Sequence, residues 1–216
     1  MQWHINKKGK GMIDYSDDFL GYLQLKQDLL FNKIPKKKIL YYIQESLDEG
    51  KKRAAEFKNM SIKDIITQLN IDVHYTEENG DFFKVKFRAQ SSIDREGKIK
   101  ILLYKPSVQE LAQANAVSFE EMWEIILAHE CFHFLEFSSK EIVSEKLDSI
   151  STIKILNYTR EAKIQSASEI AANGFAKEIL HLDHLPNYYD YMFMLKEGSI
   201  TYNDIEEEYQ EFTKLF

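Results

Sequence analysis

The spacing of apolar residues predicts helices in the first part of the chain. Within residues 36–57 the apolar side chains recur at intervals of three and four, which is typical of the buried face of a helix. The residues on this face are Ile39, Tyr42, Ile43 and Leu47. We therefore expect helices over most of residues 17–58, and a short helix over residues 62–70 that Ser61 caps.

The pattern changes at residue 71 to short runs of β-branched and aromatic residues. Turn sequences, ENGD and DREG, separate three such runs, at residues 71–76, 82–89 and 98–104. In the last run Ile99, Ile101 and Leu103 share one face, as the twofold period of a strand requires. The pattern predicts a small three-stranded antiparallel sheet.

Helical periodicity returns after Pro106. Ser118 and Glu121 have the spacing of a capping box, and they open an apolar helix. The segments that we expect to be helical are residues 120–137, 141–156, 161–180 and 203 onward. N-terminal helices, a small sheet and then further helices indicate an α+β fold.

Composition fits one globular domain with a small appendage. The 216 residues are 44% hydrophobic and include 3 prolines, and no clear linker interrupts them. We divide the chain into residues 1–60, an N-terminal helical segment packed on the core, and residues 61–216, the main domain. With a single cysteine, neither a disulfide framework nor a cysteine-rich zinc site is expected, so a metal site would need histidines and carboxylates.

Charge is distributed unevenly along the chain. The net charge is −7, and residues 106–216 carry 8 basic and 20 acidic residues. This acidic part is a poor surface for a phosphate backbone, so no direct nucleic-acid partner is expected. The chain begins without the apolar stretch of a signal peptide and contains no long apolar run, so we expect a cytoplasmic protein that does not enter a membrane.

The chemistry-bearing motif is an HExxH sequence inside the predicted helix 120–137. His129 and His133 are four residues apart, and four residues turn a helix by about 400°, so both imidazoles project from one side, where they can hold one metal ion. Glu130 lies beside that position, from which it can take a proton from a metal-bound water. Two ordinary histidines on a half-buried helix are the plain alternative.

A catalytic zinc normally takes three protein ligands, so a third must come from another element. Glu169 is our candidate, because small residues at helical spacing surround it and would let its helix approach the HExxH helix closely. Two alternatives stay open: Glu169 could instead form a capping box with Ser166, and Glu136 could be the third ligand or an outer residue.

Four further residues have predicted roles. The amide oxygen of Asn173 is expected to accept the free imidazole N–H of a ligating histidine, and an ordinary helix-surface asparagine is the alternative. Cys131 is expected to be a buried structural thiol. His181 and His184 are candidates for an oxyanion donor, although no geometric argument supports either.

HECFH followed by SEIAANGFAKEIL resembles the ImmA/IrrE family of gluzincin metallopeptidases, whose later helix reads approximately ExxANxFAxxLL. The matching positions are Glu169, Ala172, Asn173, Phe175, Ala176, Ile179 and Leu180. The resemblance covers about residues 60 to 185. It implies a zincin-like metallopeptidase domain over residues 61–216, with zinc held by His129, His133 and Glu169, and Glu130 as general base. It also implies a cytoplasmic enzyme that cleaves a protein such as a helix-turn-helix repressor.

These observations favour a zinc-dependent metallopeptidase acting on a protein or peptide. If residues 98–104 form an exposed edge strand, that strand would hold an extended substrate by β-augmentation. One alternative is a non-catalytic metal-binding regulator of the same fold. Another is a structural or nucleic-acid-associated protein with an accidental HExxH sequence.

Overall fold

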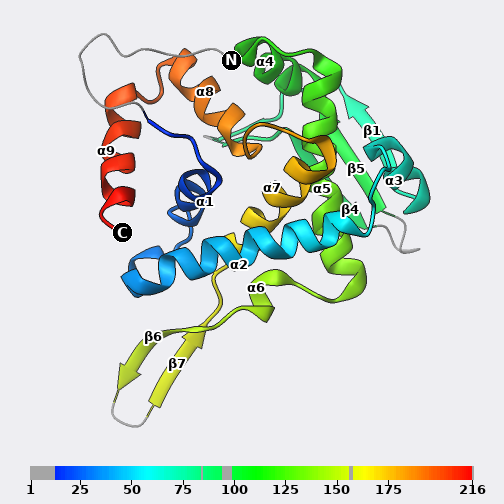
Figure 1. Ribbon diagram of the computed structural model, residues 1–216. Coiled ribbons are helices and arrows are strands. Elements are labelled where there is room, and N and C mark those ends of the chain that lie inside the picture. The colour runs from blue at the N-terminus through cyan, green and yellow to red at the C-terminus, as the bar shows by residue number, and fades with distance from the viewer. Residues whose placement is uncertain (1–12, 84, 94–98, 156–157, 216) are drawn as a thin grey trace.

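The computed structural model describes residues 13–83, 85–93, 99–155 and 158–215, and it is an α+β structure (Figure 1). Its helices are α1 Asp17–Leu25, α2 Lys36–Ala55, α3 Ile62–Gln68, α4 Lys105–Asn115, α5 Phe119–Ser139, α6 Val143–Lys146, α7 Ser166–Leu180, α8 Asn187–Glu197 and α9 Tyr202–Thr213, with a 3-10 turn at Phe31–Lys33. Its strands are β1 Asp72–Thr76, β2 Asp81–Phe82, β3 Val85–Lys86, β4 Ala89–Ile93, β5 Ile99–Tyr104, β6 Ile150–Ile155 and β7 Tyr158–Ala162.

The main sheet is mixed, so the antiparallel prediction is wrong for one of its two pairings. Its order is β1-β5-β4, in which β1 runs parallel to β5 while β4 runs antiparallel to it. The central strand is therefore β5, so the condition for substrate binding at residues 98–104, an exposed edge, is not met. The physical reason is composition: β5 buries Ile99, Ile101 and Leu103, whereas β4 is the polar sequence AQSSI and takes an edge.

The predicted strand over residues 82–89 is divided by a turn. Its first part belongs to a small hairpin of β2 and β3, and its last residue, Ala89, begins β4. Phe83 lies in this turn with a φ of 55°, a left-handed conformation that no strand can continue through. The apolar spacing alone did not reveal that interruption.

The segment between α5 and α7 is a β-hairpin where we expected helix. Over residues 141–156 the helix α6 is only four residues long, and β6 follows it. The predicted start at residue 161 is wrong too, because β7 ends at Ala162 and α7 begins at Ser166. β-branched residues at Ile150, Thr152, Ile153 and Ile155 favour an extended chain. The hairpin of β6 and β7 projects from the body of the protein (Figure 1).

Helix α7 is packed between α5 and α2, and the approach to α2 depends on glycine. A Cβ atom added at Gly50 of α2 would lie 2.2 Å from the carbonyl oxygen of Ala171 and 2.8 Å from the backbone nitrogen of Phe175. A Cβ at Gly174 of α7 would lie 3.3 Å from the carbonyl oxygen of Leu47. Gly174 therefore allows close contact of α7 with α2.

One hydrophobic core extends from the N-terminal helices to α9. It includes Phe19 of α1, Ile43 of α2, Ile101 of β5 and Phe212 of α9, and each of these is at most 5% exposed. The boundary at residue 60 stays a prediction from the sequence. In the part of the chain that the structure describes, no helix combines the length and hydrophobicity needed to cross a bilayer.

Candidate metal centre

Helix α5 presents the two histidines of the HExxH sequence toward α7. Ser118 caps the helix as predicted, and its hydroxyl accepts a hydrogen bond of 3.0 Å from the backbone N–H of Glu121. On the buried side, Phe132 packs against Phe175 of α7 with ring centroids 5.6 Å apart. This contact fixes the rotation of α5, so that His129 and His133 lie on its partly exposed face.

Helix α7 brings Glu169 to the same place from its first turn. The capping-box alternative for Ser166 and Glu169 is wrong: Gln165 is the N-cap, and no side chain makes a capping bond there. The backbone N–H of Ser166 instead donates to the Asp28 carboxylate at 2.9 Å. Glu169 therefore keeps its carboxylate for the two histidines.

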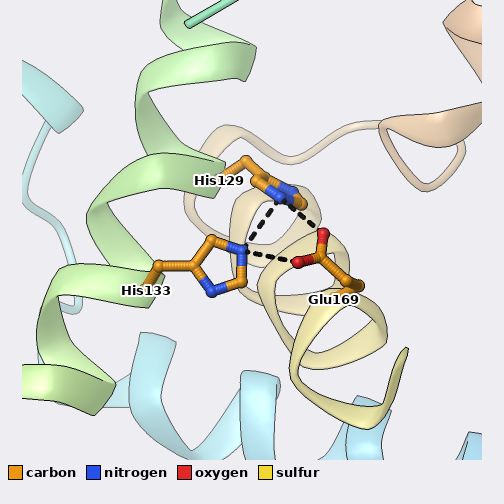
Figure 2. Close-up of side chains that lie close together, drawn as sticks. All are labelled: His129, His133 and Glu169. Atoms are coloured by element: carbon orange, nitrogen blue, oxygen red, sulfur yellow. Dashed lines mark hydrogen bonds and ion pairs between the residues drawn. The ribbon is translucent and has the colours of Figure 1, made fainter. Parts of the chain in front are cut away.

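His129, His133 and Glu169 form a cluster that can hold a metal ion (Figure 2). The two Nε2 atoms are 3.1 Å apart, and Glu169 oxygens lie 3.3 Å from Nε2 of His129 and 3.4 Å from Nε2 of His133. In a tetrahedral zinc site with bonds of about 2.0–2.1 Å, neighbouring ligand atoms are about 3.3 Å apart. Each histidine nitrogen is thus close to this spacing from one Glu169 oxygen, Oε2 for His129 and Oε1 for His133, and the donor types are those of a metal site.

The second ring nitrogen of each histidine has its own partner. Nδ1 of His129 is 3.0 Å from Oδ1 of Asn173, which lies in the outer position that the sequence predicted. Nδ1 of His133 is 3.3 Å from Oε2 of Glu136. Both contacts favour the tautomer that carries its proton on Nδ1, which leaves the Nε2 lone pairs free for a metal.

Glu136 is a buried partner of His133. It contacts Nδ1 of that ring, whereas the cluster with His129 and Glu169 uses Nε2. Its side chain is 6% exposed, and its Oε1 accepts hydrogen bonds from the backbone N–H of Val143 at 2.7 Å and the hydroxyl of Ser168 at 2.8 Å. With both oxygens engaged, Glu136 orients His133 and is not placed as a third ligand. Its HxxE spacing in the sequence was the signal for this role.

The electrostatics of the cluster favour positive charge. Burial alone would lower the pKa of His133, but its contacts with Glu136 and Glu169 outweigh burial and raise that pKa to about 10. Burial would raise the pKa of Glu169, yet its contacts with His129 and His133 bring it well below the ordinary value. Carboxylates that favour a proton on a neighbouring ring equally favour a bound cation.

Glu130 lies beside the cluster and faces the edge strand of the sheet. Its Oε2 accepts a hydrogen bond from the hydroxyl of Ser91 on β4. The next residue, Cys131, is fully buried as predicted, and burial raises the pKa of its thiol to about 12. Ser91 was missed because the sequence carries no signal that joins a residue of β4 to one of α5.

The structure does not bring the two C-terminal histidines into the cluster. His184 has Nδ1 3.2 Å from the carbonyl oxygen of Tyr15, and its ring stacks on Tyr188. His181 is the C-cap of α7, one residue past the end of the helix. Neither one belongs to the group of possible metal ligands.

No family model, curated protein or solved structure matches this chain. The assignment of a function therefore depends on the geometry of the cluster and on the chemistry of its residues.

Proposed function

We propose that this protein is a zinc-dependent metallopeptidase whose zinc ligands are His129, His133 and Glu169. One observation carries the proposal: two imidazole nitrogens of an HExxH helix and a carboxylate of a second helix converge, with one donor atom of each residue within 4.8 Å of the others. Three protein ligands leave a fourth position for water or substrate, which is the arrangement of catalytic rather than structural zinc.

Zinc in such a site lowers the pKa of a bound water toward about 7 and polarises a carbonyl group. Glu130 is the general base of the proposed reaction: its carboxylate takes the proton from the attacking water and then delivers it to the leaving amine. The hydroxyl of Ser91 holds one oxygen of that carboxylate, which positions Glu130 for the transfer. Asn173 and Glu136 fix the orientations of His129 and His133 through their Nδ1 atoms.

The edge strand beside Glu130 is β4, so this strand replaces β5 as the proposed docking site for an extended substrate. One side of β4 pairs with β5, whereas its other side pairs with no strand in the described part of the chain. Backbone hydrogen bonds to an added strand hold a peptide with little demand on its sequence. Ser91 lies on β4, so a peptide paired there would pass close to Glu130.

The resemblance to the ImmA/IrrE family extends the proposal to a biological substrate. It points to a regulatory protein such as a helix-turn-helix repressor, cleaved in the cytoplasm. The resemblance rests on SEIAANGFAKEIL, in which Glu169 falls at the position of the family's third zinc ligand.

Metal analysis and three substitutions test the proposal. Protein purified without chelators should contain about one zinc per chain by elemental analysis, and His129→Ala and Glu169→Ala should lose it. Glu130→Gln should retain zinc but lose cleavage of a denatured-protein peptide mixture, followed by mass spectrometry, by at least about 100-fold.

The same variant separates the enzyme from the non-catalytic regulator. If the zinc-loaded wild type cleaves nothing in the mixture, or if Glu130→Gln cleaves as fast as the wild type, the proposed mechanism is wrong. Protein without zinc would instead favour an accidental HExxH sequence.

A further inference from the structure

A cavity of about 340 Å³ adjoins the metal cluster on the side of the C-terminal end of α5. His133 and Glu169 form its border with the cluster, and Phe137 and Ile142 contribute apolar surface. Its other lining residues are Glu136 of α5, Ser144 of α6, and Gln165, Ser166 and Ser168 at the start of α7. A group that occupies the fourth position on the proposed zinc would therefore have this cavity directly beside it.

The apolar surface of the cavity is accessible. Phe137 is 63% exposed and Ile142 is 38% exposed, although most large apolar residues of this chain are buried in the core. Single exposed apolar residues are common on protein surfaces and need no explanation. Two that line the same cavity, next to a cluster of metal-ligand type, mark a binding surface for an apolar group.

The charged side chains that line the cavity offer no partner for an anionic substituent. Among the described residues that line it, none is a lysine or an arginine. Both oxygens of Glu136 are engaged, by His133 on one side and by Val143 and Ser168 on the other. The carboxylate of Glu169 faces the two histidines. The buried hydroxyl of Ser144 has no hydrogen-bond partner among the described residues, and as a neutral group it supplies no counter-charge.

We infer that this cavity is a specificity pocket for a large apolar side chain of the substrate, next to the scissile bond. The inference rests on the proposed zinc peptidase function, because the zinc is what would bring a substrate to this position. A volume of about 340 Å³ is enough for an aromatic or long aliphatic side chain. An anionic side chain of the same length would face the carboxylates of Glu136 and Glu169 there and would gain no lysine or arginine partner.

Three small hydroxamic acids test the pocket without knowledge of the natural substrate. Acetohydroxamate supplies the zinc-binding group alone, 3-phenylpropanohydroxamate adds an aromatic ring, and succinic monohydroxamate adds a carboxylate. Calorimetric titration of the full-length, zinc-loaded protein should show that the phenyl compound binds at least about 10-fold more tightly than acetohydroxamate, as expected for burial of a phenyl group. Succinic monohydroxamate should bind no more tightly than acetohydroxamate.

Two substitutions connect the preference to the cavity. Phe137→Ala removes part of the apolar lining, and Ile142→Trp fills the space, so each should reduce the preference for the phenyl compound to less than about threefold while acetohydroxamate binding is unchanged. Both side chains are partly exposed, so the fold should tolerate the changes, which the melting temperature checks. Phe83→Ala is the matched control, because Phe83 is 95% exposed and lies outside the cavity.

The outcomes separate the pocket from the proposed function. If acetohydroxamate binds the zinc-loaded protein but the phenyl compound binds no better, or if the preference survives both substitutions, the pocket inference is overturned and the zinc site stands. If the protein takes up no zinc, or the zinc-loaded protein binds none of the three compounds, the proposed function fails and the pocket inference fails with it.

Discussion

Glu136 holds His133 from the side opposite the proposed zinc position, with Oε2 of Glu136 3.3 Å from Nδ1 of the imidazole. The two residues lie three positions apart on α5. The other carboxylate oxygen is fixed by Val143 and Ser168, so the orientation of His133 depends on contacts with α6 and with the start of α7. The position of one proposed metal ligand is thus coupled to the packing of three helices.

Glu136→Gln should weaken zinc binding about 10- to 100-fold, because outer partners fix the tautomer and orientation of ligating histidines. Competition with a chromophoric chelator measures the affinity. Glu178→Gln is the matched control, since Glu178 is an exposed residue of α7. Equal zinc affinities for Glu136→Gln and wild type would show that the contact with His133 does not matter for the metal.

Zinc should stabilise the folded protein, and a chelator should remove that stabilisation. At a zinc concentration 100 times the dissociation constant the gain is about 2.7 kcal/mol, which raises the melting temperature of a chain of this size by roughly 5–10 °C. His129→Ala should show no zinc-dependent shift in a thermal melt. His74→Ala should keep it, because His74 is exposed on β1, outside the cluster. A shift that persists in His129→Ala would place the zinc elsewhere.

Gly50→Ala should lower the free energy of unfolding by about 3 kcal/mol, at the upper end of the range for overpacking. The added methyl group would collide with backbone atoms of Ala171 and Phe175, which cannot rotate away as a side chain could. Gly198→Ala is the control: its Cβ would meet nothing within 4 Å, so only its φ of 75° matters, at a cost of about 1 kcal/mol. Urea unfolding measures both, and equal losses would contradict the proposed importance of the α2–α7 contact.

Tyr42→Phe should lower the free energy of unfolding at neutral pH. In this variant the free energy of unfolding should also fall less as the pH is raised above 10. The Tyr42 hydroxyl donates to the carbonyl oxygen of Asp148 at 2.9 Å, and burial raises its pKa from 10.0 to about 12. Because the folded pKa is the higher one, this contribution is complete below pH 10 and is lost as pH rises toward 12.

Removal of the hydroxyl should lower the unfolding free energy by about 1 kcal/mol at pH 7. Urea titrations at pH 7, 10 and 11 compare the two proteins. The difference between wild type and Tyr42→Phe should shrink as the pH rises, and a difference that grows with pH would contradict the assigned pKa direction.

Local features were predictable from the sequence, and long-range ones were not. The Ser118 cap and the HExxH spacing are local, so they predicted α5 and the side from which His129 and His133 project. Glu169 could be proposed from its small neighbours, but its approach to the histidines depends on tertiary packing. The sequence around β5 does not show which of its neighbours is parallel and which is antiparallel, or that β5 is the central strand. The strand order, which makes β4 the edge beside Glu130, therefore came only from the structure.

The hairpin of β6 and β7 lies between the histidines of α5 and Glu169 in the sequence. The number of residues in this hairpin therefore does not set how far Glu169 lies from the histidines in space. Ile150 and Ala162 face each other across the base of the hairpin, so the chain leaves and returns at nearly the same point. The excursion between them can be shortened, lengthened or exchanged for a short turn without moving either end. We therefore expect a fluorophore or an affinity tag attached to the exposed Ser151 of β6 to leave the cluster in place.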